Sequence, residues 1–513
     1  MTLNTDHQTE KIEKPADFQT AISATKFGCY NVILLLVCLP AAFAVQFEST
    51  LISYIIPAAA CDLNLSITQK GLLNSMPFFG MIATGLLTGF LLDTLGRRKI
   101  LFTGFCIHLF VTLARSLSQS VAFLQAFQFF GGCLTGGFYV ALTTYILEFH
   151  ATEHRGRVQM IFAMLFSVGN IVIPLLSSAI LPLNLNLHLP MLDFHSWNLL
   201  ILITSCNPLF SVIAFYFLPE TPKFLMSTGK NEEALNVFRN MYKLNTRNVK
   251  HEYPVKSLIE EITNNQDSAT NKTSLMEYIK TGWEQIMPLF GKQYGLKLLL
   301  VCSVESMFLV GINSFRLYLP QIFQANHEYK LTHNGTSSAL CHILGSLNLL
   351  PKNEGDACVV NLDDSFQVYL NSMIIAAVTM FAYASAGFLI NWFGKKPLLG
   401  ILGILASLSA FCLYFAPNIT VTLTLASLYL ACCGVCFDIF LSIIVVIFPT
   451  SSRAMAISVA LCSGRGLTTL GNMIVPLLVK IGCAPPFIFW GCVIFTALAL
   501  SFVLPTTGQE DMK

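Results

Sequence analysis

Two short stretches of sequence, GFLLDTLGRRK at residues 89–99 and GFLINWFGKKP at residues 387–397, decide how this chain is organised. Each follows a long apolar run and contains a glycine directly before two or three basic residues, and the second lies 298 residues after the first. The same offset carries Arg155 onto Arg453, and each of these begins the loop after a fourth apolar run. Because the motif and the arginine repeat at the same offset, the sequence indicates that the chain is built from two repeated halves.

The apolar runs around these landmarks predict membrane-spanning helices. Hydrophobic residues make up 54% of the 513 residues and charged residues 11%, with a mean hydropathy of +0.64. Since a bilayer core needs roughly 20 apolar residues per helix, we expect an all-α membrane protein with twelve transmembrane helices in two six-helix halves. The predicted spans are 27–57, 71–92, 100–113, 121–147, 158–181, 197–218, 298–323, 366–390, 397–416, 421–448, 454–479 and 485–504.

The spans divide the chain into five segments. We expect a cytosolic N-terminal tail (1–26), an N-terminal six-helix bundle (27–218), a cytosolic central loop with short helices (219–297), a C-terminal six-helix bundle (298–504) and a cytosolic C-terminal tail (505–513). Asn231 is the predicted cap of a short amphipathic helix in the central loop. The third span is short, and we expect it to continue past Arg115, whose side chain would then extend to the membrane surface.

Basic residues near the span ends predict the orientation. With a cytosolic N-terminus, one face of the membrane receives residues 97–99, Arg155, Arg157, Lys395, Lys396, Arg453 and most basic residues of the central loop. We therefore expect both termini in the cytosol. The first 26 residues are polar, which indicates that the first span itself acts as the targeting signal.

Five ionisable side chains lie well inside the predicted spans, where each costs roughly 2.5–3.5 kcal/mol to insert. Such groups usually face a cavity or one another, so we expect some to line a substrate cavity and leave structural pairing as the alternative. Gln128, Asn74, Asn170 and Asn313 are polar enough to add hydrogen bonds there. The five ionisable residues are Glu48, Glu305, Arg316, Asp438 and Arg465.

Arg465 is the deepest of these charges by residue count. It lies 12 residues past Arg453, or about 18 Å at 1.5 Å per residue, which is near the middle of the membrane. Its guanidinium keeps its charge, so it needs a carboxylate, a backbone carbonyl or an anionic solute as a partner.

The cytosolic loops carry both charge signs in one layer, which predicts a gate. Individual salt bridges at a water boundary contribute about 0–1 kcal/mol, so a network of them could hold the cytosolic side closed and still open easily. The alternative is that the basic residues only fix the orientation. The predicted gate residues are Asp93, Arg97, Arg98, Glu148, Arg155, Glu220, Lys395 and Arg453.

The loop after the seventh span is predicted to face an oxidising compartment. It contains the acceptor sequence for a glycan at Asn334 and two cysteines, and we expect a disulfide between Cys341 and Cys358. Asn271 has a similar acceptor sequence but lies in the cytosolic central loop, so we expect it to stay unmodified. Most other cysteines lie inside apolar runs, where they behave as small hydrophobic residues.

The motif at residues 89–99, with Asp93, Gly96 and Arg97 in fixed spacing, resembles the signature of the major facilitator superfamily. Residues 148–155 and the sequence PETPK at 219–223 are similar to its sugar-porter and organic-ion branches. Residues 194–197 (FHSW) and 218–246 resemble the synaptic vesicle glycoprotein 2 group. The chain departs from that group at Gln128, where the group has an arginine, and in its shorter loop after the seventh span.

This resemblance implies a transporter that moves a small organic solute, charged or amphiphilic, by alternating access. We expect no cofactor, no bound metal, no nucleic-acid partner and a monomer in the lipid bilayer of the plasma membrane or of secretory or synaptic vesicles, with coupling to a proton or ion gradient left open. The sequence contains no phosphate-binding loop and no zinc quartet, so enzymatic chemistry is not expected. The alternative function is that of a transport-inactive vesicle protein that binds or regulates a partner.

Overall fold

The structure, a computed structural model, describes residues 15–183, 185–189, 192–246, 253–259, 291, 294–332, 339–343, 366–448 and 450–504, and leaves out the side chains of some of these, including Asp93 and Arg453. Within this part, ten helices are long and apolar enough to cross a membrane by length and composition. Two more, α4 (Ile67–Leu95) and α19 (Thr450–Ile481), have 29 and 32 residues, which is long enough at about 1.5 Å per residue. The prediction of an all-helical fold with twelve spans is therefore confirmed.

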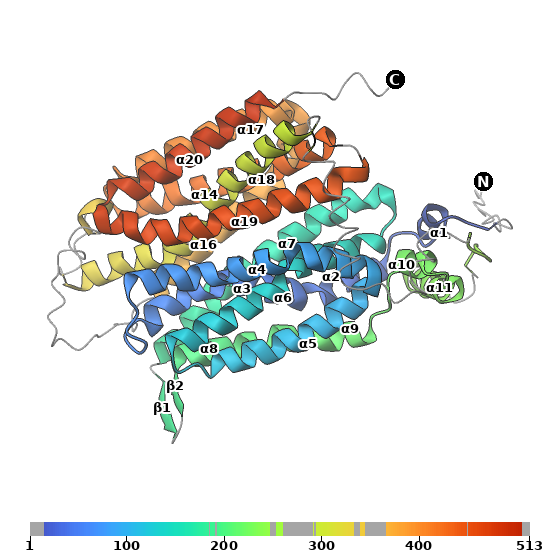
Figure 1. The fold of residues 1–513 in the computed structure, drawn as a ribbon, viewed down its shortest axis with the longest axis horizontal. Helices are drawn as coiled ribbons and strands as arrows, with labels where there is room; N and C mark the ends of the chain where they lie inside the picture. The colour runs from blue at the N-terminus through green and yellow to red at the C-terminus, as the bar shows by residue number, and fades with distance from the viewer. Residues whose placement is uncertain are drawn as a thin grey trace, which may run out of the picture.

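The twelve spans form two bundles of six that lie side by side, blue to green below and yellow to red above in Figure 1. The first bundle contains α2 (Cys29–Val37) running on into α3 (Leu39–Ala59), then α4, α5 (Arg97–Ser116), α6 (Val121–Glu148), α7 (Thr152–Ile180), and α8 (Ser196–Thr204) running on into α9 (Cys206–Phe217). The second contains α14 (Gly295–Thr332), α16 (Phe366–Phe393), α17 (Lys395–Leu413), α18 (Ile419–Ile447), α19 and α20 (Ala484–Val503). Each bundle has its own buried apolar clusters.

The two bundles meet along two seams, in which α4 packs against α19 and α7 packs against α16. Glycines in the first seam allow the helices to approach closely: a Cβ at Gly71 would lie 3.0 Å from the backbone oxygen of Asn472. A Cβ at Gly85 would lie 3.1 Å from the Sγ of Cys462. The repeat thus places equivalent helices of the two halves on either side of a shared central region.

The repeated motif forms the same sharp turn in both bundles. Gly96 separates α4 from α5 with φ of 89°, and Gly394 separates α16 from α17 with φ of 79°. Both values lie in the left-handed region, which strongly favours glycine because it has no Cβ. The backbone therefore repeats at the offset that the sequence predicts.

A small cap lies beyond one end of the bundles, where α1 (Phe18–Ala24), α10 (Pro222–Ser227) and α11 (Asn231–Thr246) gather near the N-terminus (Figure 1). Its core is apolar, with Phe18, Met226 and Phe238 buried. The backbone N–H of Ala16 donates to the carbonyl of Ser257 at 2.9 Å. The predicted short helix is present as α11, but Asn231 is its first residue and the Asn231 Oδ1 has no hydrogen-bond partner among the described residues, so the predicted capping role is wrong. The segment expected as a tail is folded onto this helix from residue 16.

The opposite end of the molecule carries a hairpin of β1 (Asn186–Leu189) and β2 (Leu192–His195), which follows the one-turn helix η1 (Leu181–Leu183) (Figure 1). The connection from α14 to α16 is tied down by a disulfide between Cys341 and Cys483. The predicted pairing of Cys341 with Cys358 is therefore wrong. The reason is spatial, because residues 339–343 pack against the end of α17, where the backbone N–H of Leu340 donates to the carbonyl of Ala416. Cys358, Asn334 and Asn271 lie outside the described residues.

Candidate functional site

A central pocket of about 520 Å³ lies where the two bundles face each other. Helices α3 and α7 of the first bundle and α14, α16 and α18 of the second all contribute to its wall. Most of its polar lining consists of hydroxyls and amides, with apolar residues between them. These polar residues are Thr50, Ser53, Tyr54, Asn170, Ser372 and Thr379.

Arg316 is the one charged residue in the lining of this pocket among the residues that the structure describes. Tyr54 lines the same pocket, but no described residue forms an ion pair or hydrogen bond with the Arg316 guanidinium. A partly buried guanidinium keeps its charge and five donors. The pocket therefore presents an unpaired cation beside neutral hydroxyls, as expected of a site for an anionic group.

Asn170 is held in the pocket wall by a neighbour, since the Nε2 of Gln46 donates to its Oδ1 at 2.6 Å. Gln46 is buried, with 5% of its surface exposed. This contact links α3 to α7. It gives the Oδ1 of Asn170 a hydrogen-bond donor. Of the asparagines predicted to supply hydrogen bonds, Asn170 lines the pocket, whereas the structure does not place Asn74 or Asn313 there.

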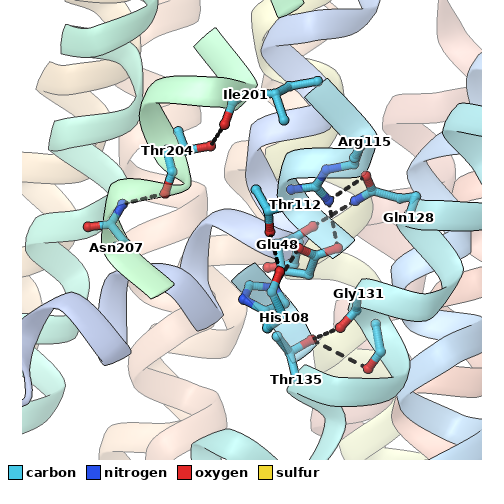
Figure 2. A network of polar contacts seen from close by, with 12 residues as sticks. Glu48, His108, Thr112, Arg115, Gln128, Gly131, Thr135, Ile201, Thr204 and Asn207 are labelled. Carbon is cyan, nitrogen blue, oxygen red and sulfur yellow. Dashed lines mark hydrogen bonds and ion pairs between the residues drawn. The ribbon is translucent and has the colours of Figure 1, made fainter. Parts of the chain in front are cut away.

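A second polar cluster lies inside the first bundle and away from the pocket (Figure 2). Glu48 Oε1 accepts from Arg115 Nη1 at 2.7 Å, and Glu48 Oε2 lies 3.1 Å from His108 Nε2. The same Arg115 nitrogen donates to Gln128 Oε1 at 2.9 Å, and Gln128 Nε2 donates to the backbone oxygen of Glu48 at 2.8 Å. All four residues are at most 3% exposed, so α3, α5 and α6 share a closed, buried network.

This network changes two of the sequence-based interpretations. Arg115 does not extend to the membrane surface but is buried against Glu48, so that expectation is wrong; a carboxylate on a neighbouring helix provides the partner that makes burial tolerable. Glu48 and Gln128 were predicted to line a cavity, yet their polar atoms are used within the bundle. Gly131 leaves the space that the Glu48 carboxylate occupies, because a Cβ there would overlap it.

Two acidic residues of the second bundle interact electrostatically. Glu305 on α14 is fully buried, and neither of its carboxyl oxygens has a hydrogen-bond partner among the described residues. It interacts electrostatically with Asp438 on α18, which is exposed by surface area whereas Glu305 is not. Because a buried carboxyl without a partner is far more stable when neutral, this pair is suited to holding a proton. Neither residue is part of the pocket lining.

Arg465 connects the two bundles. Its Nη1 donates to the backbone carbonyl of Gly136 on α6 at 3.1 Å, which is one of the three kinds of partner that its charge predicts. Two further hydrogen bonds run along the α4–α19 seam, from Ser75 Oγ to the carbonyl of Thr469 at 3.1 Å and from Asn472 Nδ2 to the carbonyl of Asn74 at 3.4 Å. Arg465 thus belongs to the contact surface between the halves.

The predicted gate residues Glu220 and Arg98 join two helix ends within the first bundle. Glu220 Oε1 accepts from the backbone N–H groups of Arg97 at 3.1 Å and Arg98 at 3.0 Å. A carboxylate at a helix N-terminus satisfies unpaired donors and favours the helix dipole. In return, Arg98 donates to the last carbonyls of α9, those of Phe215 at 2.9 Å and Tyr216 at 2.7 Å.

The other predicted gate residues also have partners within their own halves. Arg97 Nη2 lies 3.4 Å from Glu148 Oε1, Arg155 Nε donates to the carbonyl of His150 at 3.0 Å, and Lys395 Nζ donates to the carbonyl of Ser442 at 3.4 Å. The side chains of Asp93 and Arg453 lie outside the described residues. A latch between the halves at this end therefore stays a prediction, whereas the described contacts brace each half separately.

Sequence reasoning missed the roles of Arg115 and His108. The signal that could have found them is their spacing, since residues seven apart lie two turns apart on the same face of a helix. A histidine and an arginine on one face of an otherwise apolar helix indicate an acidic partner on a neighbouring helix.

Comparison with known proteins gives a consistent picture of the fold. The family model described as Major Facilitator Superfamily matches residues 38–351. The inward-open structure of the xylose transporter XylE from E. coli is similar with a TM-score of 0.65 and 16% identity, covering 94% of this chain and 98% of that chain. The structure of a D-xylose-proton symporter is similar with a TM-score of 0.63 and 17% identity, covering 93% and 98%.

Two of the curated relatives are synaptic vesicle glycoproteins by name. Synaptic vesicle glycoprotein 2B of Rattus norvegicus is 28% identical over 238 residues, which are 45% of this chain and 34% of that protein. Synaptic vesicle glycoprotein 2C of Mus musculus is 25% identical over 248 residues, which are 48% and 34%. The chain thus spans about a third of the length of these relatives.

Proposed function

Since this chain belongs to the Major Facilitator Superfamily, a family of membrane transporters, we propose that it is a secondary transporter that moves a small organic anion through the central pocket by alternating access. The observation that carries this proposal is Arg316, an unpaired guanidinium in the wall between the two bundles. An anionic group there would satisfy donors that the described residues leave free. The neighbouring hydroxyls and apolar residues suit the organic part of the solute.

Coupling to a proton gradient is the second part of the proposal. Glu305 and Asp438 are two electrostatically coupled acids in the second bundle, and Glu305 is fully buried. A transported proton could bind there during one half of the cycle and leave when the seam rearranges. One of the structural neighbours is named a D-xylose-proton symporter, so its transport is coupled to protons. This supports the proposal only by analogy of fold.

Uptake into proteoliposomes tests the proposal. We expect organic anions to accumulate in preference to organic cations, and a proton gradient of the correct sign to increase the rate. Arg316→Gln should lower anion uptake about tenfold or more, because a hydrogen bond to a charged group contributes roughly 1.5–3 kcal/mol, and Arg316→Lys should keep part of it. Arg239→Gln is the matched control, since Arg239 lies on α11 and is exposed.

Uptake of cations alone would contradict the assignment of an anion, and equal anion uptake by wild type and Arg316→Gln would contradict the role of Arg316. A protein that folds and binds solutes in this pocket but transports none of them would favour the alternative, a transport-inactive membrane protein that regulates a partner.

A further inference from the structure

A second pocket, of about 330 Å³, lies at the end of the molecule that carries the cap. One wall comes from the connection between α1 and α2, at residues 22–27, and the other from the connection between α6 and α7 and the first turn of α7, at residues 149–154. It shares no lining residue with the central pocket. It is therefore a different pocket from the one proposed for solute transport.

His150 lines this pocket and has an unsatisfied nitrogen. The residue is 1% exposed, and its Nδ1 lies 2.8 Å from the carbonyl oxygen of Ile146. A carbonyl oxygen only accepts, so Nδ1 must carry the hydrogen, and in the neutral ring Nε2 is left with a free lone pair. Nε2 is buried and has no partner among the described residues. Buried polar atoms are nearly always paired, so His150 indicates a missing partner.

The surroundings of His150 favour a negative charge. Ala151 is the N-cap of the 29-residue helix α7 and offers no side chain to cap it, so the positive end of the helix dipole lies at the pocket, although the N–H of His154 already donates to the Ala151 carbonyl at 2.9 Å. Lys26 and His154 also line it. Arg155 lies behind His150, donating to its carbonyl. Glu153 is the one acid among the described lining residues.

The backbone at Lys26 is held in an uncommon conformation beside this pocket. Its φ of 56° lies in the left-handed region, which costs a non-glycine residue roughly 1–2 kcal/mol. Asn245 Nδ2 stabilises the conformation by donating to the Lys26 carbonyl at 2.7 Å. On the other side, the ring of Phe27 lies 5.4 Å from that of His154 and 6.0 Å from that of His150, which gives the pocket an aromatic wall.

We propose that this pocket binds a phosphate group, with its oxygens on the α7 N-terminus and Lys26 and with one shared proton between a phosphate oxygen and His150 Nε2. The shared proton is the reason why we propose a phosphate group and not a carboxylate. Burial lowers the pKa of His150, the hydrogen bond to Ile146 opposes this, and His154 and Arg155 lower the pKa further, so the surroundings favour the neutral imidazole. A phosphate with a second pKa of about 6 still brings a P–OH donor near neutral pH, whereas a carboxylate does not.

The phosphate could belong to a lipid headgroup that carries a phosphate monoester, since a diester headgroup has no P–OH to share, or to a soluble phosphate compound, because the pocket lies next to the start of the first membrane span, α2. Both sources offer the same chemistry to Lys26, His150 and the helix end. The inference does not depend on transport, since its measurement is binding.

Calorimetry on the purified full-length chain in detergent, with inorganic phosphate as the probe, tests this site. Wild type should bind phosphate at pH 6.5 and should bind acetate much more weakly. Affinity should fall as the pH rises to 8, because the shared proton is then lost from phosphate and is not held by His150. Lys26→Gln and His150→Gln should each weaken binding at least fivefold, whereas Lys230→Gln, an exposed lysine with its own partner Glu233, should leave it unchanged.

Lys26→Gln keeps the test informative if His150→Gln folds poorly, since Lys26 is exposed. Absence of phosphate binding by wild type, equal binding of acetate, or unchanged binding by Lys26→Gln would overturn the proposal. Repeating the titration in nanodiscs with and without phosphatidylinositol 4,5-bisphosphate separates the sources. Loss of phosphate binding in the presence of that lipid assigns the site to a headgroup, and unchanged binding assigns it to a soluble compound.

Discussion

Glu48 and Arg115 illustrate how a single pair of residues allows charge to lie inside a membrane bundle. Their side chains are 2.7 Å apart and nearly fully buried. Removing one member leaves the other charged and unpaired in a medium of low dielectric constant. Removing both leaves no unpaired buried charge, and the cost to stability is therefore smaller. The pair is therefore expected to act as a unit.

We predict that Glu48→Gln or Arg115→Gln alone destabilises the protein by about 3–5 kcal/mol, and that the double substitution costs much less. Thermal unfolding in detergent, together with the amount of folded protein recovered, measures this. Glu232→Gln is the control, because Glu232 is exposed on α11. Additive losses in the double variant would show that the two side chains do not depend on each other.

The sequence was sufficient to single out Glu48 and Gln128 as polar groups that need a reason to lie in an apolar run. It was not sufficient to tell a cavity residue from a member of a closed network, because that depends on Arg115 and His108 arriving from another helix. Arg316 is among the predicted candidates and lines the central pocket, whereas Glu305 lies 11 residues earlier on nearly the same face of α14, about 16 Å away along the helix axis.

At the scale of elements, the corner between α5 and α9 is stabilised from both sides. Glu220 caps the start of one helix, and Arg98 reaches the end of the other. Gly96 is part of the same arrangement, since a Cβ there would lie 2.6 Å from Glu220 Oε2. The motif of residues 89–99 thus stabilises the corner between α5 and α9, whether or not it also forms the predicted gate.

We predict that Glu220→Ala increases the hydrogen exchange of the Arg97 and Arg98 amides about fivefold and destabilises the protein by roughly 1 kcal/mol, as loss of a helix cap usually does. Hydrogen exchange with mass spectrometry measures the first effect and thermal unfolding the second. In Glu233→Ala, where the acid lies on α11, the amides at the start of α5 should exchange as in wild type. Unchanged protection in Glu220→Ala would mean that water or another group replaces the cap.

The helices themselves were largely predictable, because a long apolar run has few structures open to it other than a membrane-spanning helix. The repeated glycines, Gly96 and Gly394, mark the turns between helices. The cap was predicted only in part. Ala234, Val237 and Phe238 gave the amphipathic pattern of α11, but residues 16–25 looked like a polar tail. Their burial depends on Phe18 and Ile22 meeting α10 and α11, which lie more than 190 residues further along the chain.

At the scale of the whole molecule, the two halves touch through close packing and a few hydrogen bonds to backbone carbonyls. Such contacts are directional but individually weak, with net values of about 0.5–1.5 kcal/mol each. The α4–α19 seam can therefore separate at modest cost, as alternating access requires.

We predict that Gly85→Cys forms a disulfide with the native Cys462 under mild oxidation, because a Cβ at residue 85 would lie 3.1 Å from the Cys462 sulfur. The crosslink should stop uptake, and a reductant should restore it. Gly466→Cys is the control, since among the described atoms a Cβ there would have only the Cδ1 of Ile82 within 4 Å, at 3.9 Å. Full uptake by the crosslinked Gly85→Cys protein would mean that this seam stays closed throughout the cycle.

The disulfide between Cys341 and Cys483 has a consequence for biosynthesis. The two cysteines are 142 residues apart, and Cys483 lies in the short connection before the final helix, α20. During synthesis the bond can form only after α19 has been inserted and its far end has reached the compartment that holds Cys341. The oxidised pair therefore marks a chain whose second bundle is almost complete, and a quality-control system that senses free thiols could use it to distinguish finished molecules from truncated ones.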